Sequence, residues 1–324
     1  MPEKIDFKSR LMKFQSLIAL AIMCVTMAFL SDRFMTADNL WVIMRHISVN
    51  VCISVGMTLV IIAAGIDLSV GSIIAITGAI AAGLIKSGTY VPVIDAYLSY
   101  TVFGGCIAAI FTGSMLGMFN GIAITKFKVP PFIATLAMLT IARGLCLLWT
   151  NGFPITGLGD TFSFIGTGWF FGIPMPVWIS AIIVAIAIFI TKRTRFGRYV
   201  YAVGGNENAS RLSGLDVNRI KVIVYTISGA LSAVGGLLIT SKLNSAAPTA
   251  GTGYELDSIA AVVIGGTSLD GGKGSVFGTV QGALIIGVLN NGLVLLGVSP
   301  FWKQVIKGCV ILTAVIIDKW NSKD

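Results

Sequence analysis

Charged residues are scarce in this sequence. Asp, Glu, Lys and Arg make up 11% of its 324 residues, whereas soluble domains contain about 25%. Hydrophobic residues make up 55%, and the mean hydropathy is +0.89. This composition excludes a globular enzyme held by a single anchor and indicates a polytopic membrane protein.

Residue patterns that support catalysis are also missing. The chain has one histidine, His46, so no pair of histidines can bind a metal ion. It has no GxSxG motif. The segment GGTSLDGGKGS, residues 265–275, is rich in glycine but does not match a phosphate-binding loop, because Gly272 occupies the lysine position and Gly274 follows Lys273. We therefore expect neither a metal site nor nucleotide hydrolysis in this chain.

The cysteines have no CxxC spacing and lie within apolar runs, so we interpret them as small hydrophobic residues. They are Cys24, Cys52, Cys106, Cys146 and Cys309. The first apolar run has no small-residue cleavage site and is followed by further apolar runs. We therefore expect it to be a membrane span and not a cleavable signal peptide.

Long apolar runs separated by polar segments predict an all-α fold with about ten transmembrane helices. The predicted spans are residues 16–30, 47–64, 70–85, 101–124, 132–149, 177–190, 222–240, 259–265, 276–296 and 301–317. Several are shorter than the roughly 20 residues that a crossing needs, so we expect broken helices or local thinning of the bilayer. Residues 34–44 predict a separate amphipathic helix at the outer surface, capped by Thr36 or Asp38.

The distribution of Lys and Arg predicts the orientation. In the ten-span topology, 16 basic residues lie in inner segments and five in outer segments. Because basic loops stay in the cytoplasm, we expect both termini there. The same distribution explains the net charge of +9 by topology and anionic lipid, not by nucleic acid. We expect a single transmembrane domain over residues 1–324. It comprises an N-terminal segment (1–15), spans 1–6 (16–190), a cytoplasmic loop (191–221), spans 7–10 (222–317) and a cytoplasmic tail (318–324).

The loop at residues 191–221 is the longest polar interruption and carries seven of the 23 basic residues. Gly204 and Gly205 interrupt the chain, and Asn206 can cap a short helix with Glu207 in its first turn. Gly214 can end this helix, and Asp216 or Asn218 can begin the next. Glu207 and Arg211 are four residues apart and can form an ion pair. A short capped helix in a cytoplasmic loop is suited to contact a partner.

Two halves of the chain show weak similarity. GSMLGMFNG at 113–121 resembles GSVFGTVQG at 274–282, whereas the Asn-Gly pairs at 120–121 and 291–292 give a register that differs by about ten residues. Because the two segments are five spans apart, we expect an inverted repeat that relates spans 2–5 to spans 7–10. Chance resemblance between glycine-rich helices is the alternative. The spacing of small residues predicts close helix packing at Gly113, Gly117, Gly274, Gly278 and Gly282.

Polar residues in or beside the spans are candidates for a translocation path. They are Asn50, Asp67, Ser69, Asn120, Asn290 and Asn291. For the asparagines, hydrogen bonds between helices are the alternative. Asp67 can equally cap a helix, and Arg143, a cation within span 5, can be functional or paired inside the bundle.

Five segments resemble permease subunits of bacterial ABC importers for monosaccharides. They are GIDLSVGS (65–72), PPFIATLAMLTIARGL (130–145), TRFGRYVYAVGGNENASRLSGLDVNRIKV (194–222), PTAGTGYELDSIAAVVIGGTSLDGGKGS (248–275) and NNGLVLLGV (290–298). The resemblance extends from about Ser16 to Asp318. It implies a multi-pass protein of the bacterial inner membrane that translocates a monosaccharide and is not itself an enzyme.

The resemblance also implies partners. A second copy would complete the pore, a cytoplasmic ATPase would bind ATP and magnesium, and a periplasmic protein would deliver the sugar. The coupling segment that contacts the ATPase would comprise Gly205, Asn206, Glu207, Ala209, Arg211 and Gly214. It departs from the family's EAA signature, because Asn208 follows Glu207 and the glycine comes seven residues on, not six.

Two other classes are less compatible with the sequence. An ion-coupled secondary transporter would show inverted repeats too, but it needs carboxylates near the middle of the bilayer. Asp67, Glu255, Asp257 and Asp270 all lie at predicted span ends. An intramembrane enzyme would need a nucleophile or a metal site, and the sequence has a motif for neither.

Overall fold

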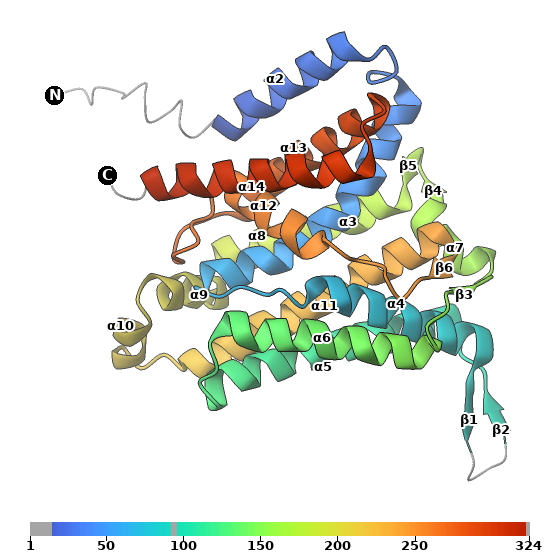
Figure 1. The fold of residues 1–324 in the computed structure, drawn as a ribbon. Coiled ribbons are helices and arrows are strands. Elements are labelled where there is room, and N and C mark those ends of the chain that lie inside the picture. Colours follow the sequence, from blue (N-terminus) through green and yellow to red (C-terminus); the bar gives the residue numbers. More distant parts are fainter. Residues whose placement is uncertain (1–14, 92–95, 322–324) are drawn as a thin grey trace.

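The computed structural model describes residues 15–91 and 96–321, and these residues are mostly helical (Figure 1). The helices are α2 (Gln15–Leu30), α3 (Ala37–Ile62), α4 (Val70–Ser87), α5 (Val102–Lys126), α6 (Pro131–Thr150), α7 (Asp160–Thr167), α8 (Met175–Arg193), α9 (Arg195–Gly205), α10 (Glu207–Leu212), α11 (Val217–Leu243), α12 (Tyr254–Ile264), α13 (Val276–Leu295) and α14 (Pro300–Asn321). Residues 318–321 of the predicted tail belong to α14, whereas the rest of the tail and most of the N-terminal segment lie outside the described residues.

The strands are short and pair only at the ends of helices. β1 (Thr89–Val91) pairs with β2 (Ala96–Leu98), β3 (Ile155–Thr156) with β6 (Ser245–Ala246), and β4 (Trp169–Phe170) with β5 (Ile173–Pro174), all antiparallel. β3 and β6 join segments about 90 residues apart. The β3–β6 pair therefore fixes the loop after α6 to the loop after α11.

Seven described helices are long and apolar enough to cross a membrane: α3, α4, α5, α6, α8, α11 and α13. The chain is therefore an all-α polytopic membrane protein. α2 is apolar but has only 16 residues. α14 has 22 residues but carries two lysines in its first half, Lys303 and Lys307.

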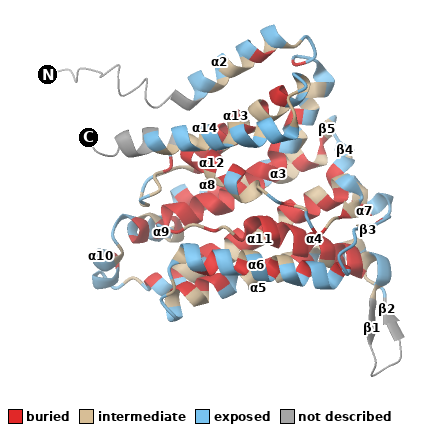
Figure 2. Ribbon diagram, in the orientation of Figure 1, coloured by how far each residue is buried: buried red, intermediate tan, exposed pale blue. Residues whose placement is uncertain are grey.

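The helices differ strongly in burial. In the most apolar part of α3, 89% of residues are buried, against 22% in α5 and in α8. Figure 2 shows the buried residues concentrated on α3, α4 and α11, in the middle of the bundle. The peripheral helices expose apolar side chains such as Phe103, Phe111 and Ile186, which is the pattern of a surface in contact with lipid.

The separate outer helix predicted at residues 34–44 is wrong. α3 begins at Ala37, is capped by Thr36, which accepts a bond from the Asn39 amide at 3.4 Å, and continues without interruption to Ile62. No glycine or proline lies between Ala37 and Val55, so nothing in the backbone stops the helix at the membrane surface. From Ile47 onward every residue of α3 is buried.

α12 is a half-helix. It begins at Tyr254, five residues before the predicted start of span 8, yet has only 11 residues, about 16 Å in length. The loop before it meets the start of α4, because a Cβ at Gly71 would overlap the Gly251 carbonyl and the Glu255 carboxylate. Two interrupted segments thus contact each other inside the bundle, in agreement with the expectation of broken helices.

Close helix contacts lie at four of the five predicted packing glycines. On α5, a Cβ at Gly113 would overlap Gly229 of α11, and one at Gly117 would overlap the Tyr225 carbonyl. On α13, Cβ atoms at Gly278 and Gly282 would overlap the carbonyls of Gly265 and Ala261. Gly274 is different, because it precedes α13, has a φ of 152° and contacts Thr267 in its own loop. Its assignment to a helix ladder is wrong.

The helices run roughly side by side, so the molecule has two ends (Figure 1). α9 and α10 lie at one end, as do the first residues of α2 and the last turns of α14. The α7 helix and the β1–β2 hairpin lie at the other end. The 191–221 segment thus forms part of one face of the bundle.

Candidate functional site

The first part of the 191–221 segment forms a helix that the sequence analysis missed. α9 begins after Thr194, whose hydroxyl oxygen accepts a bond from the Gly197 amide at 3.2 Å, and it ends at Gly205. Its buried side includes Val200 and Val203. The signal was present in the spacing of Phe196, Val200 and Val203 at intervals of four and three residues.

α9 packs against the end of α3 and against the glycine-rich segment 265–275. Gly204 lies so close to the Ile62 carbonyl that a Cβ would overlap it. The Gly272 amide donates to the same carbonyl at 2.9 Å, and the Tyr201 hydroxyl donates to the Gly274 carbonyl at 2.8 Å. Burial raises the pKa of Tyr201. Gly271 and Gly272 of this segment therefore serve close backbone packing against the end of α3 and against α9.

α10 has the predicted local structure. The side-chain oxygen of Asn206 accepts a bond from the Ala209 amide at 2.9 Å. Gly214 has a φ of 83°, a left-handed conformation that favours glycine. Of the two predicted caps for the following helix, Asp216 is the one observed, because its carboxylate accepts a bond from the Arg219 amide at 3.0 Å.

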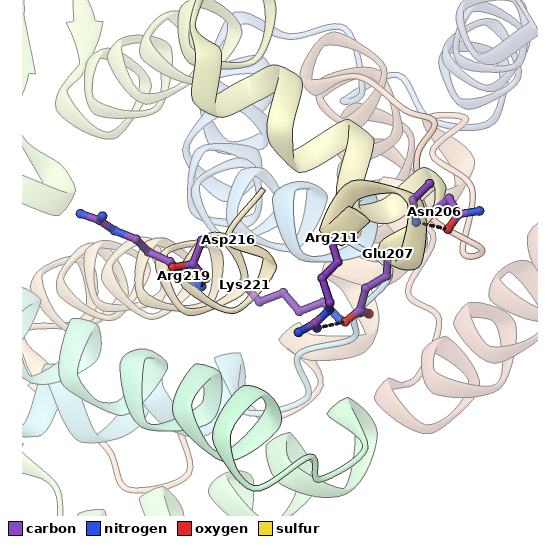
Figure 3. Close-up of polar contacts among 7 residues, drawn as sticks. Asn206, Glu207, Arg211, Asp216, Arg219 and Lys221 are labelled. Atoms are coloured by element: carbon purple, nitrogen blue, oxygen red, sulfur yellow. Dashed lines mark hydrogen bonds and ion pairs between the residues drawn. The ribbon is translucent and has the colours of Figure 1, made fainter. Parts of the chain in front are cut away.

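Glu207 joins α10 to α11. Its carboxylate forms the predicted ion pair with Arg211 at 3.1 Å and a second, unpredicted pair with Lys221 at 2.6 Å (Figure 3). The hydrogen bond from Lys221 is the main reason that the pKa of Glu207 lies below its usual value. Arg219, only two residues from Lys221, points away from this group (Figure 3). Lys221 lies in the second turn of the central helix α11, so this pair connects α10 to the core of the bundle.

The outer side of α10 is free of contacts with the rest of the described chain. Asn208 and Ala209 are exposed, and Leu212 is 90% exposed. Leu212 is therefore accessible to a partner at this end of the protein. The predicted coupling residues thus lie on one short helix, together with Gly205 and Gly214 at its two ends.

A second polar group lies inside the bundle around Asp67, which is fully buried. One carboxylate oxygen of Asp67 accepts bonds from the Ser69 amide at 3.0 Å and the Ser69 hydroxyl at 2.6 Å. The other accepts a bond from the Ser228 hydroxyl at 2.8 Å. The Asn120 amide in turn donates to the Ser69 hydroxyl oxygen at 2.9 Å. Asp67, Ser69 and Asn120 therefore lie together, and Ser228 completes a group that we call the Asp67 cluster.

The other predicted path residues have different partners. Asn50 accepts a bond from Ser54 at 3.4 Å. Asn291 and Asn39 exchange two amide hydrogen bonds, of 2.9 and 3.1 Å, between α13 and α3. The side-chain oxygen of Asn290 is buried and has no hydrogen-bond partner among the residues that the structure describes. None of these three predicted residues shares a hydrogen bond with the Asp67 cluster.

Residues 39–315 match a family of transporter subunits described as the permease component of branched-chain amino acid transport systems. The chain belongs to this permease family. This permease is 49% identical to a ribose import permease of Haemophilus influenzae, over 96% of the chain and 94% of that protein. It is 48% identical to the ribose import permease of Escherichia coli K12, over 96% and 95%. It is 34% identical to a xylose transport permease of Haemophilus influenzae, over 98% and 99%. No solved structure matches.

These relatives and the seven apolar helices identify the permease as a multi-pass protein of the inner membrane. The described residues contain no group of three His, Cys, Asp or Glu side chains that could hold a metal ion. Arg143 of the permease donates to the carbonyls of Pro248 and Ala250, in the loop before α12. Its charge is thus held by backbone acceptors of the protein, as expected for a cation within an apolar helix.

Proposed function

We propose that this permease forms the membrane pathway of an ATP-driven importer for a monosaccharide of the ribose class. Two copies form the pathway, a separate cytoplasmic ATPase hydrolyses ATP with magnesium, and a periplasmic binding protein delivers the sugar. The substrate class rests on the relatives, which include import permeases for ribose, xylose and D-allose. The observation that carries the mechanism is α10, a capped helix that is exposed outward and ion-paired inward to α11.

α10 is suited to transmit movement. It has six residues, so it has no hydrophobic core of its own. Its position depends on Glu207, on the cap at Asn206 and on the left-handed turn at Gly214. A protein that binds Leu212 and Ala209 therefore moves α10 together with α11, because Glu207 forms an ion pair with Lys221. α11 contains Ser228 of the Asp67 cluster, which links this movement to the middle of the bundle.

We propose that the permease crosses the membrane ten times, with both termini in the cytoplasm. The remaining spans are α2, α14 and the interrupted segment that contains the half-helix α12. The orientation is supported by the position of α2 and α14. The beginning of α2 and the end of α14 lie on the same side of the bundle as α9 and α10 (Figure 1). That side carries the cation-rich 191–221 segment, which favours the cytoplasm. α2 and α14 are about 24 and 33 Å long, lengths that suit a thinned and an ordinary bilayer.

Helix contacts support the inverted repeat. The contact of α5 with α11 corresponds to that of α13 with α3. The contacts of α4 with α5 and α6 correspond to those of α12 with α13 and α14. The contact of α4 with α11 corresponds to that of α12 with α3. Each of these contacts thus has a counterpart when spans 2–5 are related to spans 7–10, whereas the contact between α5 and α6 has no counterpart of similar extent between α13 and α14. The glycine ladders are not counterparts, because Gly113 and Gly117 contact α11 whereas Gly278 and Gly282 contact α12. The glycines of the Asn-Gly pairs are not counterparts either, because Gly121 contacts Val222 of α11 whereas Gly292 contacts Met27 of α2.

The test is uptake into proteoliposomes that contain the permease, its ATPase and its binding protein. In liposomes whose ATPase faces the lumen, we expect labelled ribose to accumulate only when the lumen contains ATP. Excess xylose or allose should compete with the labelled ribose less well than unlabelled ribose does. Collapsing proton and sodium gradients with ionophores should leave uptake unchanged. Uptake that follows an ion gradient without ATP would instead identify an ion-coupled secondary transporter.

A further inference from the structure

A cavity of about 300 Å³ lies beside α10 and is not used by the proposed transport mechanism. Its walls come from the α5–α6 turn, from α10 and from the beginning of α11. The lining residues are Ile124, Thr125, Lys128, Val129, Pro130, Pro131, Glu207, Arg211, Asn218 and Lys221. We call this space the α5–α10 cavity.

The α5–α10 cavity has an excess of positive charge. Lys128, Arg211 and Lys221 line it, against one carboxylate, Glu207. Glu207 already binds both Arg211 and Lys221, and Lys128 forms no ion pair with any residue that the structure describes. Three cations and one shared carboxylate leave the site with a net charge of about +2. An anion bound here would receive charge-assisted hydrogen bonds from all three cations.

The cavity also has an apolar side that faces the lipid. α5 ends at Lys126 and α6 begins at Pro131, so the turn between them lies where two lipid-facing helices leave the membrane. Phe127 beside the cavity is 70% exposed, and Ile133 in the first turn of α6 is 54% exposed. Val129, Pro130 and Pro131 contribute apolar wall. The opening therefore combines a cationic base with a surface suited to hydrocarbon.

We propose that the α5–α10 cavity binds the phosphate diester of an anionic phospholipid from the inner leaflet. Lys128, Arg211 and Lys221 hold the phosphate, and the apolar wall contacts the glycerol and the first methylenes. A basic pocket between helices on the cytoplasmic side is the recognised form of an anionic lipid site. The apolar wall favours a lipid over free phosphate, which would make no use of it. The assignment of the lipid to the inner leaflet rests on the orientation given in the proposed function, whereas the binding chemistry does not depend on it.

A bound lipid would bridge two elements that otherwise have few direct contacts. The phosphate would connect Lys128 of the α5–α6 turn to Arg211 of α10, across the cavity. The position of α10 would then depend on the lipid composition of the membrane as well as on Glu207. In this way the same site would adjust how firmly the segment that contacts the ATPase is held.

The experiment is a lipid titration of the purified full-length permease in a zwitterionic detergent, followed by thermal unfolding. Phosphatidylglycerol is the anionic probe, phosphatidylethanolamine is the probe without net charge, and glycerol 1-phosphate is the free anion. The test variant is Lys128→Gln. The matched control is Lys126→Gln, which removes an exposed cation two residues away that does not line the cavity. Lys128 has a φ of 55°, a conformation that glutamine adopts at a cost similar to that for lysine.

We expect phosphatidylglycerol alone to raise the unfolding temperature in a saturable way. The half-saturating concentration should be about fivefold higher for Lys128→Gln, the factor that one cation near a lipid surface contributes, and within twofold of wild type for Lys126→Gln. Equal titrations of the two variants would overturn the proposal in favour of a general basic surface. An equal shift with glycerol 1-phosphate would show a site for a free anion, and an equal shift with phosphatidylethanolamine would exclude charge recognition. The permease is measured alone, so failure of ATP-driven uptake would leave this result unaffected.

Discussion

The carboxylate of Asp67 accepts a hydrogen bond of 2.8 Å from the hydroxyl of Ser228, 161 residues further along the chain. Asp67 lies in the break between α3 and α4, and Ser228 lies on α11, so the bond ties an interrupted segment to the central helix. The sequence leaves two roles open for Asp67, a pathway residue or a helix cap. The carboxylate does not cap α4, because its backbone partner is the amide of Ser69, the residue before the helix, and α4 has no side-chain cap hydrogen bond. Asp67 instead joins this turn to α11. It accepts bonds from the Ser69 amide and hydroxyl as well, and no part of it is exposed.

We therefore expect Asp67→Asn to fold and to retain uptake within a few-fold, because the amide oxygen keeps the bonds to Ser69 and the amide nitrogen can donate to Ser228. Asp67→Leu should fail to accumulate in the membrane, since it leaves the Ser69 amide and the Ser228 hydroxyl buried without partners, at about 1–3 kcal/mol each. Membrane levels and ribose uptake measure both effects. An Asp67→Asn protein that assembles normally but transports nothing would show that the negative charge itself takes part in transport.

The turn after α10 gives a second prediction. Gly214→Val places a β-branched residue at a φ of 83°, which costs at least about 1–2 kcal/mol and tilts α10. We expect normal insertion, loss of ribose uptake and loss of ATP hydrolysis stimulated by the binding protein. Ser213→Val is the matched control, because Ser213 is exposed and has an ordinary φ of −78°. Uptake at the wild-type rate in Gly214→Val would mean that α10 is only a connector.

The two partners of Glu207 should contribute unequally to stability. The side chain of Arg211 is 55% exposed and that of Lys221 is 15% exposed, so water screens the Lys221 pair less. A double-mutant cycle with Glu207→Gln should give about 0.3–0.5 kcal/mol for Arg211→Met, and about 0.5–1 kcal/mol for Lys221→Met. Equal coupling energies in detergent unfolding would contradict the dominance of Lys221.

The same carboxylate predicts a dependence on pH. The folded-state pKa of Glu207 is lowered, mainly by the hydrogen bond from Lys221. Its contribution is therefore complete above the ordinary carboxyl pKa of about 4.5 and is lost as the pH falls through the lower folded value. Wild type should lose more stability than Glu207→Gln across this acidic range. Parallel stability curves for the two proteins would show that the pair contributes nothing.

Packing at Gly278 gives a further prediction. Gly278→Leu should prevent assembly, because a side chain there overlaps the Gly265 carbonyl at the end of α12. Gly144→Leu is the control, since no atom lies within 4 Å of a Cβ at this exposed position on α6. Size-exclusion profiles and yields in detergent compare the two. A well-folded Gly278→Leu protein would mean that α12 can move away from α13.

Labelling of single cysteines tests the orientation. A cysteine at the exposed Asp160, in the first turn of α7, should react with an impermeant maleimide added to intact cells. One at the exposed Asn208 on α10 should react only after the membrane is opened. Reaction of Asn208→Cys from outside would reverse the proposed topology and place α10 away from the ATPase.

The sequence by itself determined the class of protein, the apolar helices and the local structure of α10. These features depend on composition, on hydrophobic runs and on caps such as Asn206 with Gly214, which act over a few residues. It did not determine that α3 continues from Ala37 through the membrane. An amphipathic pattern passes there into an apolar run, and no residue pattern shows whether the two form one helix or two.

Only the tertiary structure decided which distant residues meet. Lys221 reaches Glu207 because α10 folds back onto the start of α11, and Ser228 reaches Asp67 because α11 passes beside the break between α3 and α4. Gly274, which shares a sequence pattern with Gly113, lies outside the helix because Ser275 caps α13 just after it. Hydrophobic periodicity fixes which residues face inward, but the choice among inward-facing partners depends on how whole helices pack.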